Sequence, residues 1–162
     1  MRDFSDDHSA LALNTATLGH MLDGHGAGWS PEQVIDACAE RGLAGIVFWR
    51  REIGTRAQEI GERVRAAGME VVGLCRSPFL VGSGAHSNLD EARAAVDMAA
   101  ALGSPVLTVV SGGTEPGTKG VLESQKILAE RVASIAAYAQ ECHVNLALEP
   151  LNPMFGGNRT CL

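Results

Sequence analysis

Short apolar runs alternate along this chain with longer segments in which apolar residues recur every three or four positions. The runs are typical of β-strands, and the segments between them are typical of amphipathic helices. Most runs are apolar at consecutive positions, so we expect strands that are covered on both faces, as in a parallel sheet. The runs cover residues 11–14, 45–49, 71–75, 105–110 and 145–149.

Four helices are expected between these runs. The clearest begins with Ser30, Pro31 and Gln33, a pattern that predicts a capping box, and it should end at Gly42. Strand starts recur at the spacing that one crossover helix requires, and no linker or low-complexity segment separates them. The pattern predicts an α/β protein with an N-terminal tail at residues 1–10 and one domain at residues 11–162.

Two architectures fit five parallel strands and four helices. A doubly wound open sheet suits the chain length, because a complete (β/α)₈ TIM barrel needs roughly 250 residues. The end of the chain favours an incomplete barrel, since Pro150 and Pro153 leave no room for a helix that would cover the fifth strand. The first run also lacks the tight glycine turn of a dinucleotide-binding fold. We therefore predict a partial TIM barrel truncated after strand five, with the open sheet as the alternative.

Composition narrows the range of functions. The chain has 162 residues, a formal charge of −6 and 46% apolar residues, and its 13 basic side chains form no long run. These values disfavour nucleic-acid and membrane partners and indicate a folded protein. The polar start has no secretory leader, which predicts a cytoplasmic protein. The dispersed cysteines offer no zinc or redox pair, so reduced thiols are expected.

Polar residues follow the predicted strands at the edge where ligands bind in both architectures. Glu149 is the most informative, because it ends an apolar strand and is followed by Pro150. Its carboxylate should point into the mouth of the sheet, where a buried carboxylate needs a cation. An ion pair with Arg50 or Arg76, a divalent metal and an acid/base role remain open. Trp49 is either a sugar-stacking platform or part of the core rim.

The ordered motifs resemble the sugar phosphate isomerase/epimerase family, a group of xylose isomerase-like TIM barrels related to the endonuclease IV fold. The most specific motif is Glu-Pro-Leu-Asn at residues 149–152, and the resemblance extends over roughly residues 11–162. The other motifs are Leu13-Asn14-Thr15-Ala16-Thr17, Trp29-Ser30, Gly45-Ile46-Val47-Phe48-Trp49-Arg50 and Gly73-Leu74-Cys75-Arg76.

The resemblance implies a metal-dependent enzyme of carbohydrate metabolism. Glu149 corresponds to one of four ligands to Mn²⁺, Mg²⁺ or Co²⁺, and the other three would lie beyond Leu162, so the metal should be poorly bound or absent in this chain. The expected reaction is proton abstraction next to a carbonyl through an enediolate, with Glu149 also catalytic. The full-length protein would be an isomerase acting on a sugar or sugar phosphate, whereas the 162-residue chain alone should be inactive. The residues expected to bind substrate are Asn14, Trp49, Arg50, Arg76 and Asn152.

One position departs from the family's ketose 3-epimerases. They carry a second glutamate six positions after the metal ligand, where this chain has Phe155. A keto-sugar 3-epimerase is therefore disfavoured, while an isomerase, a sugar or inositol dehydratase and another lyase remain open. Five strands cannot close a barrel, so an isolated chain should aggregate through its edge strands. A non-catalytic half-barrel that assembles with itself or with a partner is the alternative.

Overall fold

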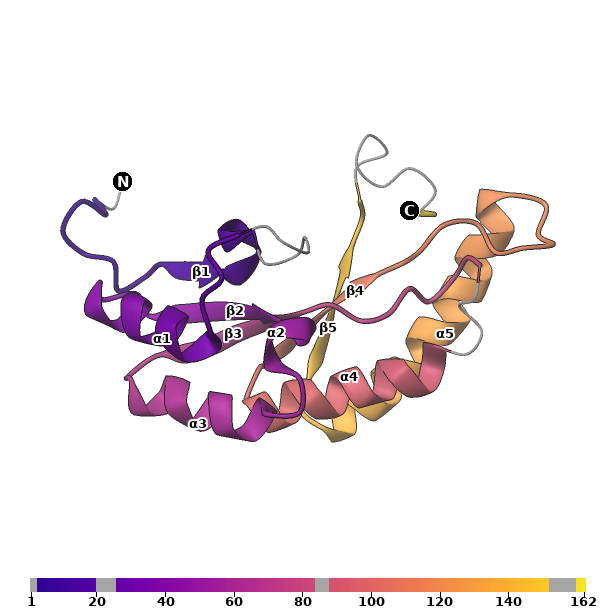
Figure 1. The fold of residues 1–162 in the computed structure, drawn as a ribbon. Helices are drawn as coiled ribbons and strands as arrows, with labels where there is room; N and C mark the ends of the chain where they lie inside the picture. The colour runs from indigo at the N-terminus through magenta and orange to yellow at the C-terminus, as the bar shows by residue number, and fades with distance from the viewer. Residues whose placement is uncertain (1–2, 20–25, 84–87, 152–159) are drawn as a thin grey trace. The chain divides into compact units, whose positions relative to one another are not determined.

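Strands and helices alternate along the whole chain in the computed structural model (Figure 1). The structure describes residues 3–19, 26–83, 88–151 and 160–162. The chain forms two compact units, each with its own strands and helices. The first unit comprises residues 1–75 and 101–105, and the second comprises residues 76–100 and 106–162.

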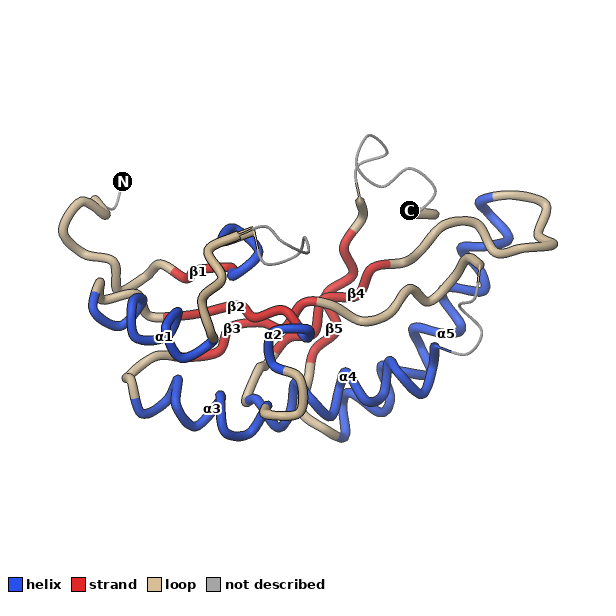
Figure 2. The backbone as a smooth tube through the Cα atoms, viewed as in Figure 1, coloured by secondary structure: helices blue, strands red, loops and turns tan. Residues whose placement is uncertain are grey.

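The first unit contains a parallel three-stranded arrangement in which β2 lies between β1 and β3 (Figure 2). Its strands are β1 (Ala12–Asn14), β2 (Gly45–Trp49) and β3 (Glu70–Cys75). Its helices are the 3-10 helix η1 (Thr15–Leu18), α1 (Pro31–Glu40), α2 (Arg50–Ile53) and α3 (Ala57–Ala66). This order excludes a flavodoxin-like sheet, where β1 separates β2 from β3.

The core of the first unit forms where the apolar faces of its helices and strands are buried. Phe48 and Ile46 of β2 are fully buried, as are Ile35 of α1 and Val64 of α3. The three- and four-residue spacing of the apolar positions in α1 and α3 places them on one side of each helix. Burial of these side chains provides most of the driving force for folding of this unit.

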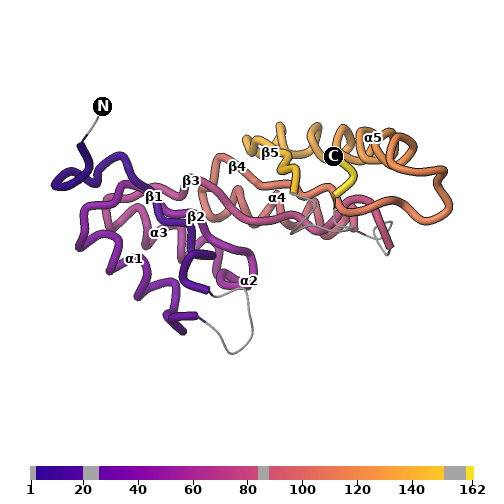
Figure 3. Tube along the Cα trace, turned by 90° about the horizontal axis from the view of Figure 1, so that it is seen from above, coloured from indigo at the N-terminus to yellow at the C-terminus, as the bar shows by residue number. Residues whose placement is uncertain are grey.

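The second unit pairs two strands in parallel, β4 (Val106–Val110) and β5 (Asn145–Glu149). Their register runs from Val106 opposite Asn145 to Val110 opposite Glu149. The helix α5 (Val121–Glu141) lies beside α4 (Asn88–Leu102), as Figure 3 shows, and the last two residues of α4 belong to the first unit. Ala92, Val96, Leu128 and Ile135 are buried on these helices.

The predicted elements are largely confirmed. All five strands are present, with boundaries that differ from the prediction by at most one residue. The helix that begins after Ser30 has the predicted capping box, and Gly42, Gly68 and Gly103 follow helices with positive φ. The short α2 and η1 were not predicted, because a helix of four residues has no periodic apolar stripe.

The longest helix, α5, has 21 residues but carries charged side chains along its length. In the described ranges, no helix combines the length and the apolar character that crossing a membrane requires. All four cysteines are free thiols, as expected. Burial raises the pKa of the Cys38 and Cys161 thiols, which keeps them in the unreactive protonated form.

Candidate functional site

Side-chain hydrogen bonds join the carboxyl ends of β1 and β2. The indole N–H of Trp49 donates to the side-chain oxygen of Asn14 over 3.1 Å, and the backbone N–H of Ala16 donates to the same oxygen over 3.0 Å. Asn14 thereby also caps η1. The structure thus brings two of the predicted substrate-binding residues into direct contact.

Glu52 supports this cluster, although the sequence pattern did not single it out. Its Oε2 atom accepts a hydrogen bond from the Thr15 hydroxyl over 2.5 Å and another from the backbone N–H of Trp49 over 3.2 Å. Thr15 is only 1% exposed, so the carboxylate satisfies a buried hydroxyl group. The available signal was spacing, since Glu52 follows Trp49 by three positions, as a capping-box glutamate does.

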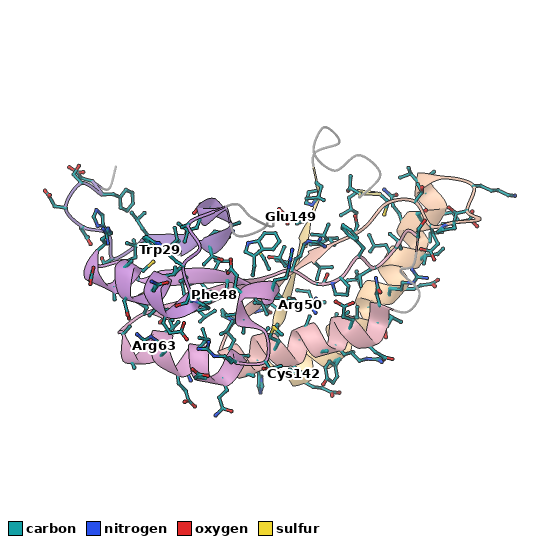
Figure 4. The ribbon with its side chains drawn as sticks, viewed as in Figure 1. Trp29, Phe48, Arg50, Arg63, Cys142 and Glu149 are labelled. Carbon is teal, nitrogen blue, oxygen red and sulfur yellow. The ribbon has the colours of Figure 1, made fainter. Side chains whose placement is uncertain are left out.

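The two arginines predicted to bind substrate both follow directly on strands. Arg50 is the first residue of α2, immediately after β2, and is partly buried (Figure 4). Arg76 follows β3, and its guanidinium carbon lies 4.4 Å from the centre of the Phe79 ring. This stacking restricts the orientation of the Arg76 guanidinium. Its Nη1 atom also donates to the Ser77 carbonyl over 3.4 Å. Their roles in substrate binding remain predictions.

In the second unit, the loop after β4 packs closely against the segment after β3. The backbone N–H groups of Leu80 and Val81 both donate to the Ser111 carbonyl, over 3.0 and 2.9 Å. Gly112 has a φ of +91°, and a Cβ atom at this position would lie 1.9 Å from the Val81 carbonyl oxygen. Only glycine permits both this backbone conformation and this close approach.

A buried ion pair connects the same two segments to α5. The carboxylate of Glu115 binds the Arg131 guanidinium through both oxygens, over 3.0 and 3.1 Å, and accepts the backbone N–H of Gly82 over 2.9 Å. Arg131 also donates to the Leu80 carbonyl over 2.5 Å. The backbone N–H of Glu115 in turn donates to the Ser124 hydroxyl over 2.9 Å. These bonds hold both loops in place, since the Glu115 side chain is only 8% exposed.

The two loops line a pocket of about 630 Å³. The glycine-rich segment after β4 forms one wall. Glycine-rich loops of this kind can present backbone N–H groups to an anion. The lining residues are Phe79, Val81, Gly82, Ser83, Gly113, Thr114, Glu115, Pro116, Gly117 and Thr118.

Glu149 ends β5, as Figure 4 shows, but it is exposed. The expectation of a buried carboxylate is therefore wrong for this chain. Four of the five residues of β5 are exposed, including Leu148 at 44%, because β5 pairs with β4 along one edge in the described residues. Among the described residues, none forms a hydrogen bond or an ion pair with the Glu149 carboxylate.

The oxygens of Glu149 are of the type that Mg²⁺ and Mn²⁺ prefer, and Glu149 fits as a single ligand. Within residues 3–19, 26–83, 88–151 and 160–162, no group of three or more His, Cys, Asp or Glu side chains is placed to hold a metal. These residues alone therefore do not form a complete metal site. Asn152, also predicted to bind substrate, lies outside the described residues.

Parallel strands that alternate with helices, and polar side chains gathered where strands end, define an α/β protein of the TIM-barrel type. The chain belongs to the xylose isomerase-like TIM barrel family, whose model matches residues 35–160. This confirms the partial barrel and the resemblance seen in the sequence, and it rejects the open-sheet alternative. No curated protein matches this chain.

Solved structures agree with this assignment. Protein SMc04130 from Sinorhizobium meliloti 1021 is 32% identical, with a TM-score of 0.79 over 96% of this chain and 55% of that protein. A xylose isomerase domain-containing protein from Salmonella typhimurium LT2 is 10% identical, with a TM-score of 0.69 over 92% of this chain and 52% of its own. A sugar phosphate isomerase/epimerase from Parabacteroides distasonis ATCC 8503 is 13% identical, with a TM-score of 0.60 over 90% and 52%. The chain thus spans about half the length of these proteins.

Proposed function

We propose that this chain supplies half of the catalytic barrel of a metal-dependent sugar or sugar phosphate isomerase or epimerase. Membership of the xylose isomerase-like family supports the reaction class. The observation that carries the proposal is the Glu149 carboxylate, which is exposed at the carboxyl end of β5 without a partner among the described residues. The position of Glu149 supports this role, because TIM-barrel enzymes bind their ligands at the carboxyl ends of the strands.

In this proposal, Glu149 has two tasks at the reacting centre. It contributes one ligand to a divalent ion such as Mn²⁺, Mg²⁺ or Co²⁺, which when bound polarises neighbouring oxygens of an open-chain sugar. Glu149 also accepts the proton from the carbon next to the carbonyl. The electron pair of the broken C–H bond forms a carbon–carbon double bond, and the π pair of the carbonyl moves onto its oxygen, which gives an enediolate. Return of the proton to the former carbonyl carbon, together with transfer of a proton from the neighbouring hydroxyl to the enediolate oxygen, completes an isomerisation. A dehydratase or lyase would begin with the same abstraction and then expel a leaving group.

The other predicted residues would bind the substrate. Asn14 is the last residue of β1, and Arg50 and Arg76 directly follow β2 and β3. In TIM barrels, ligands bind at these carboxyl ends of the strands. Their side chains donate hydrogen bonds, which suits the hydroxyl, carbonyl and phosphate oxygens of a sugar phosphate. Asn152 would contribute in the same way.

Deuterium incorporation tests the proposal, because proton abstraction in D₂O labels the substrate even without net turnover. The assay uses D-xylose, D-fructose and D-fructose 6-phosphate with Mn²⁺ or Mg²⁺, followed by proton NMR. We expect no incorporation with the chain alone. We expect incorporation with a chimera in which this chain replaces the corresponding half of the Sinorhizobium protein, which is 32% identical to it.

Two variants of the chimera make the test specific. Glu149→Gln should lower the rate of incorporation about 100-fold or more, the usual scale for loss of a catalytic proton carrier. Glu141→Gln replaces another exposed glutamate of the second unit, and it should leave the rate unchanged. Full activity in Glu149→Gln would reject the proposed role.

The exposed β5 strand supports a second candidate, a non-catalytic half-barrel that assembles with a second copy. A parallel strand is normally covered on both faces, whereas four of five β5 residues are exposed. Sedimentation of the metal-free chain distinguishes the two: a stable dimer favours assembly, and a monomer rejects it. Leu148→Lys should dissociate such a dimer. Leu148 is 44% exposed on this strand, so a charge there would be buried in the contact between the two copies.

A further inference from the structure

We propose that Trp49 is a positioning residue that fixes Asn14 as a hydrogen-bond donor, so that Asn14 binds an oxygen acceptor of the ligand. The ligand part of this inference rests on the proposed function, whereas the orientation of the Asn14 amide depends only on contacts within the first unit.

The orientation follows from the chemistry of the two neighbours of Asn14. The backbone N–H of Ala16 and the indole N–H of Trp49 lie 3.0 and 3.1 Å from the same Asn14 side-chain atom. Both groups can donate a hydrogen bond and neither can accept one. The atom that faces them must therefore be the amide oxygen, because the flipped amide would place an NH₂ group against two donors.

This orientation determines what Asn14 offers to a ligand. Both acceptor positions of its oxygen are occupied, which leaves the NH₂ group with two N–H donors. No described residue accepts a hydrogen bond from that NH₂ group, and Asn14 is partly exposed where β1 ends. The matching ligand group is a sugar hydroxyl, a carbonyl or a phosphate oxygen. A donor-only group such as an ammonium would meet two donors and be rejected.

Trp49 can fix the amide because its own position is held. Its backbone N–H donates to Glu52 over 3.2 Å, and the same Glu52 oxygen accepts the buried Thr15 hydroxyl over 2.5 Å. The cluster therefore ties the ends of β1 and β2 together. A tryptophan that served only as a stacking platform could be replaced by phenylalanine, whereas the positioning role requires the indole N–H.

The orientation is tested first without any ligand, by hydrogen exchange on ¹⁵N-labelled protein. The chain has only two tryptophans, so each indole signal can be assigned by substitution. We expect the Trp49 indole proton to exchange at least about 10-fold more slowly than that of Trp29, which is 45% exposed. Asn14→Leu should accelerate exchange at Trp49 alone. Equal exchange at the two indoles would overturn the inference.

The second test follows the NMR signals of the Asn14 NH₂ group while a probe is added. These signals are assigned by their absence in Asn14→Leu. Inorganic phosphate and D-fructose provide acceptors, and methylammonium at matched ionic strength is the donor-only probe. Phosphate should shift these signals and methylammonium should not. Trp49→Phe should weaken the apparent phosphate affinity about 3- to 10-fold, because one of the two anchoring hydrogen bonds is lost. The matched control Trp29→Phe should leave it unchanged.

The outcomes separate this inference from the proposed function. A response to phosphate without a response to D-fructose supports the donor role of Asn14 and counts against a neutral sugar as substrate. The inference is overturned if methylammonium shifts the Asn14 NH₂ signals, even if the sugar binds. It is also overturned if Trp49→Phe leaves the phosphate affinity unchanged.

Discussion

Tyr138 joins the two helices of the second unit through one hydrogen bond. It is the only tyrosine of the chain, and its hydroxyl donates to Asp97 over 2.5 Å. This hydrogen bond, with added effects of burial and the Asp97 charge, raises the pKa of Tyr138 to about 12. Ionisation would lose the hydrogen bond and place a phenolate beside a carboxylate.

Titration of the phenolate absorbance follows this single residue. We expect a midpoint near pH 12 and a shift towards the ordinary value of 10.0 in Asp97→Asn. Because folding raises this pKa, the hydrogen bond should stabilise the protein fully below pH 10 and cease to do so as the pH rises through about 12. Asp90→Asn, on the same helix, should leave the midpoint unchanged, and a wild-type midpoint near 10 would contradict the contact.

Two glycines of the loop after β4 provide a matched pair for backbone strain. Gly112 and Gly117 both have positive φ, but only Gly112 has a neighbour, the Val81 carbonyl oxygen, within contact of an added Cβ atom. Gly117→Ala should cost about 1–2 kcal/mol through strain alone, and Gly112→Ala about 2–5 kcal/mol because overpacking adds to it. Urea unfolding measures both, and equal losses would show that the close approach is unimportant.

At the scale of residues, the sequence predicted where the site lies better than which side chains bind one another there. Asn14 and Trp49 were identified because each ends a strand, which a local pattern reveals. Their mutual hydrogen bond depends on the pairing of β1 with β2, a contact between residues 35 positions apart. Glu115 and Arg131 were missed for the same reason, since no local pattern marks a loop carboxylate that binds a distant helix.

At the scale of elements, α1 depends on a reciprocal cap. The backbone N–H of Gln33 donates to the Ser30 hydroxyl over 3.3 Å, and the backbone N–H of Ser30 donates to the Gln33 side chain over 2.8 Å. Pro31 at the first helical position reinforces this start. Such local signals explain why the helix boundaries could be predicted, whereas the four-residue α2 could not.

Removing the cap should destabilise the first unit measurably. Ser30→Ala should lower the free energy of unfolding by about 1 kcal/mol, because a donor at the helix start loses its acceptor. Ser134→Ala changes an exposed serine inside α5 and should be neutral or slightly stabilising, because alanine is the better helix former. Thermal unfolding of both variants would show the difference, and equal stabilities would argue against the capping box.

For the whole molecule, most of the architecture was predictable because βα alternation is a repeated local pattern. The exposure of Glu149 was not predictable, since the burial of β5 depends on what lies beside it and not on its own residues. The chain spans 55% of the Sinorhizobium protein, so the catalytic activity of the complete barrel remains a proposal.

The buried pair of Glu115 and Arg131 should dominate the stability of the second unit. Arg131→Met should cost about 3–5 kcal/mol, because it leaves the Glu115 carboxylate buried without its partner. The double variant Glu115→Gln/Arg131→Met should recover much of that loss. Arg93→Met, which removes an exposed pair with Asp90, should cost no more than about 1 kcal/mol. Urea unfolding measures the free energy of unfolding of all three variants. Similar losses of stability in Arg131→Met and Arg93→Met would contradict the greater importance of the buried pair.

The same pair limits how this part of the protein can be engineered. Glu115 is held by a helix residue, Arg131, and by the backbone of Gly82, which follows a different strand. A loop-exchange library that transplants only residues 111–120 onto another scaffold would carry the carboxylate without its counterparts. The loop can therefore be transferred only together with the segment that carries Gly82 and the helix that carries Arg131. Recombination breakpoints between these three segments should yield mostly misfolded chimeras.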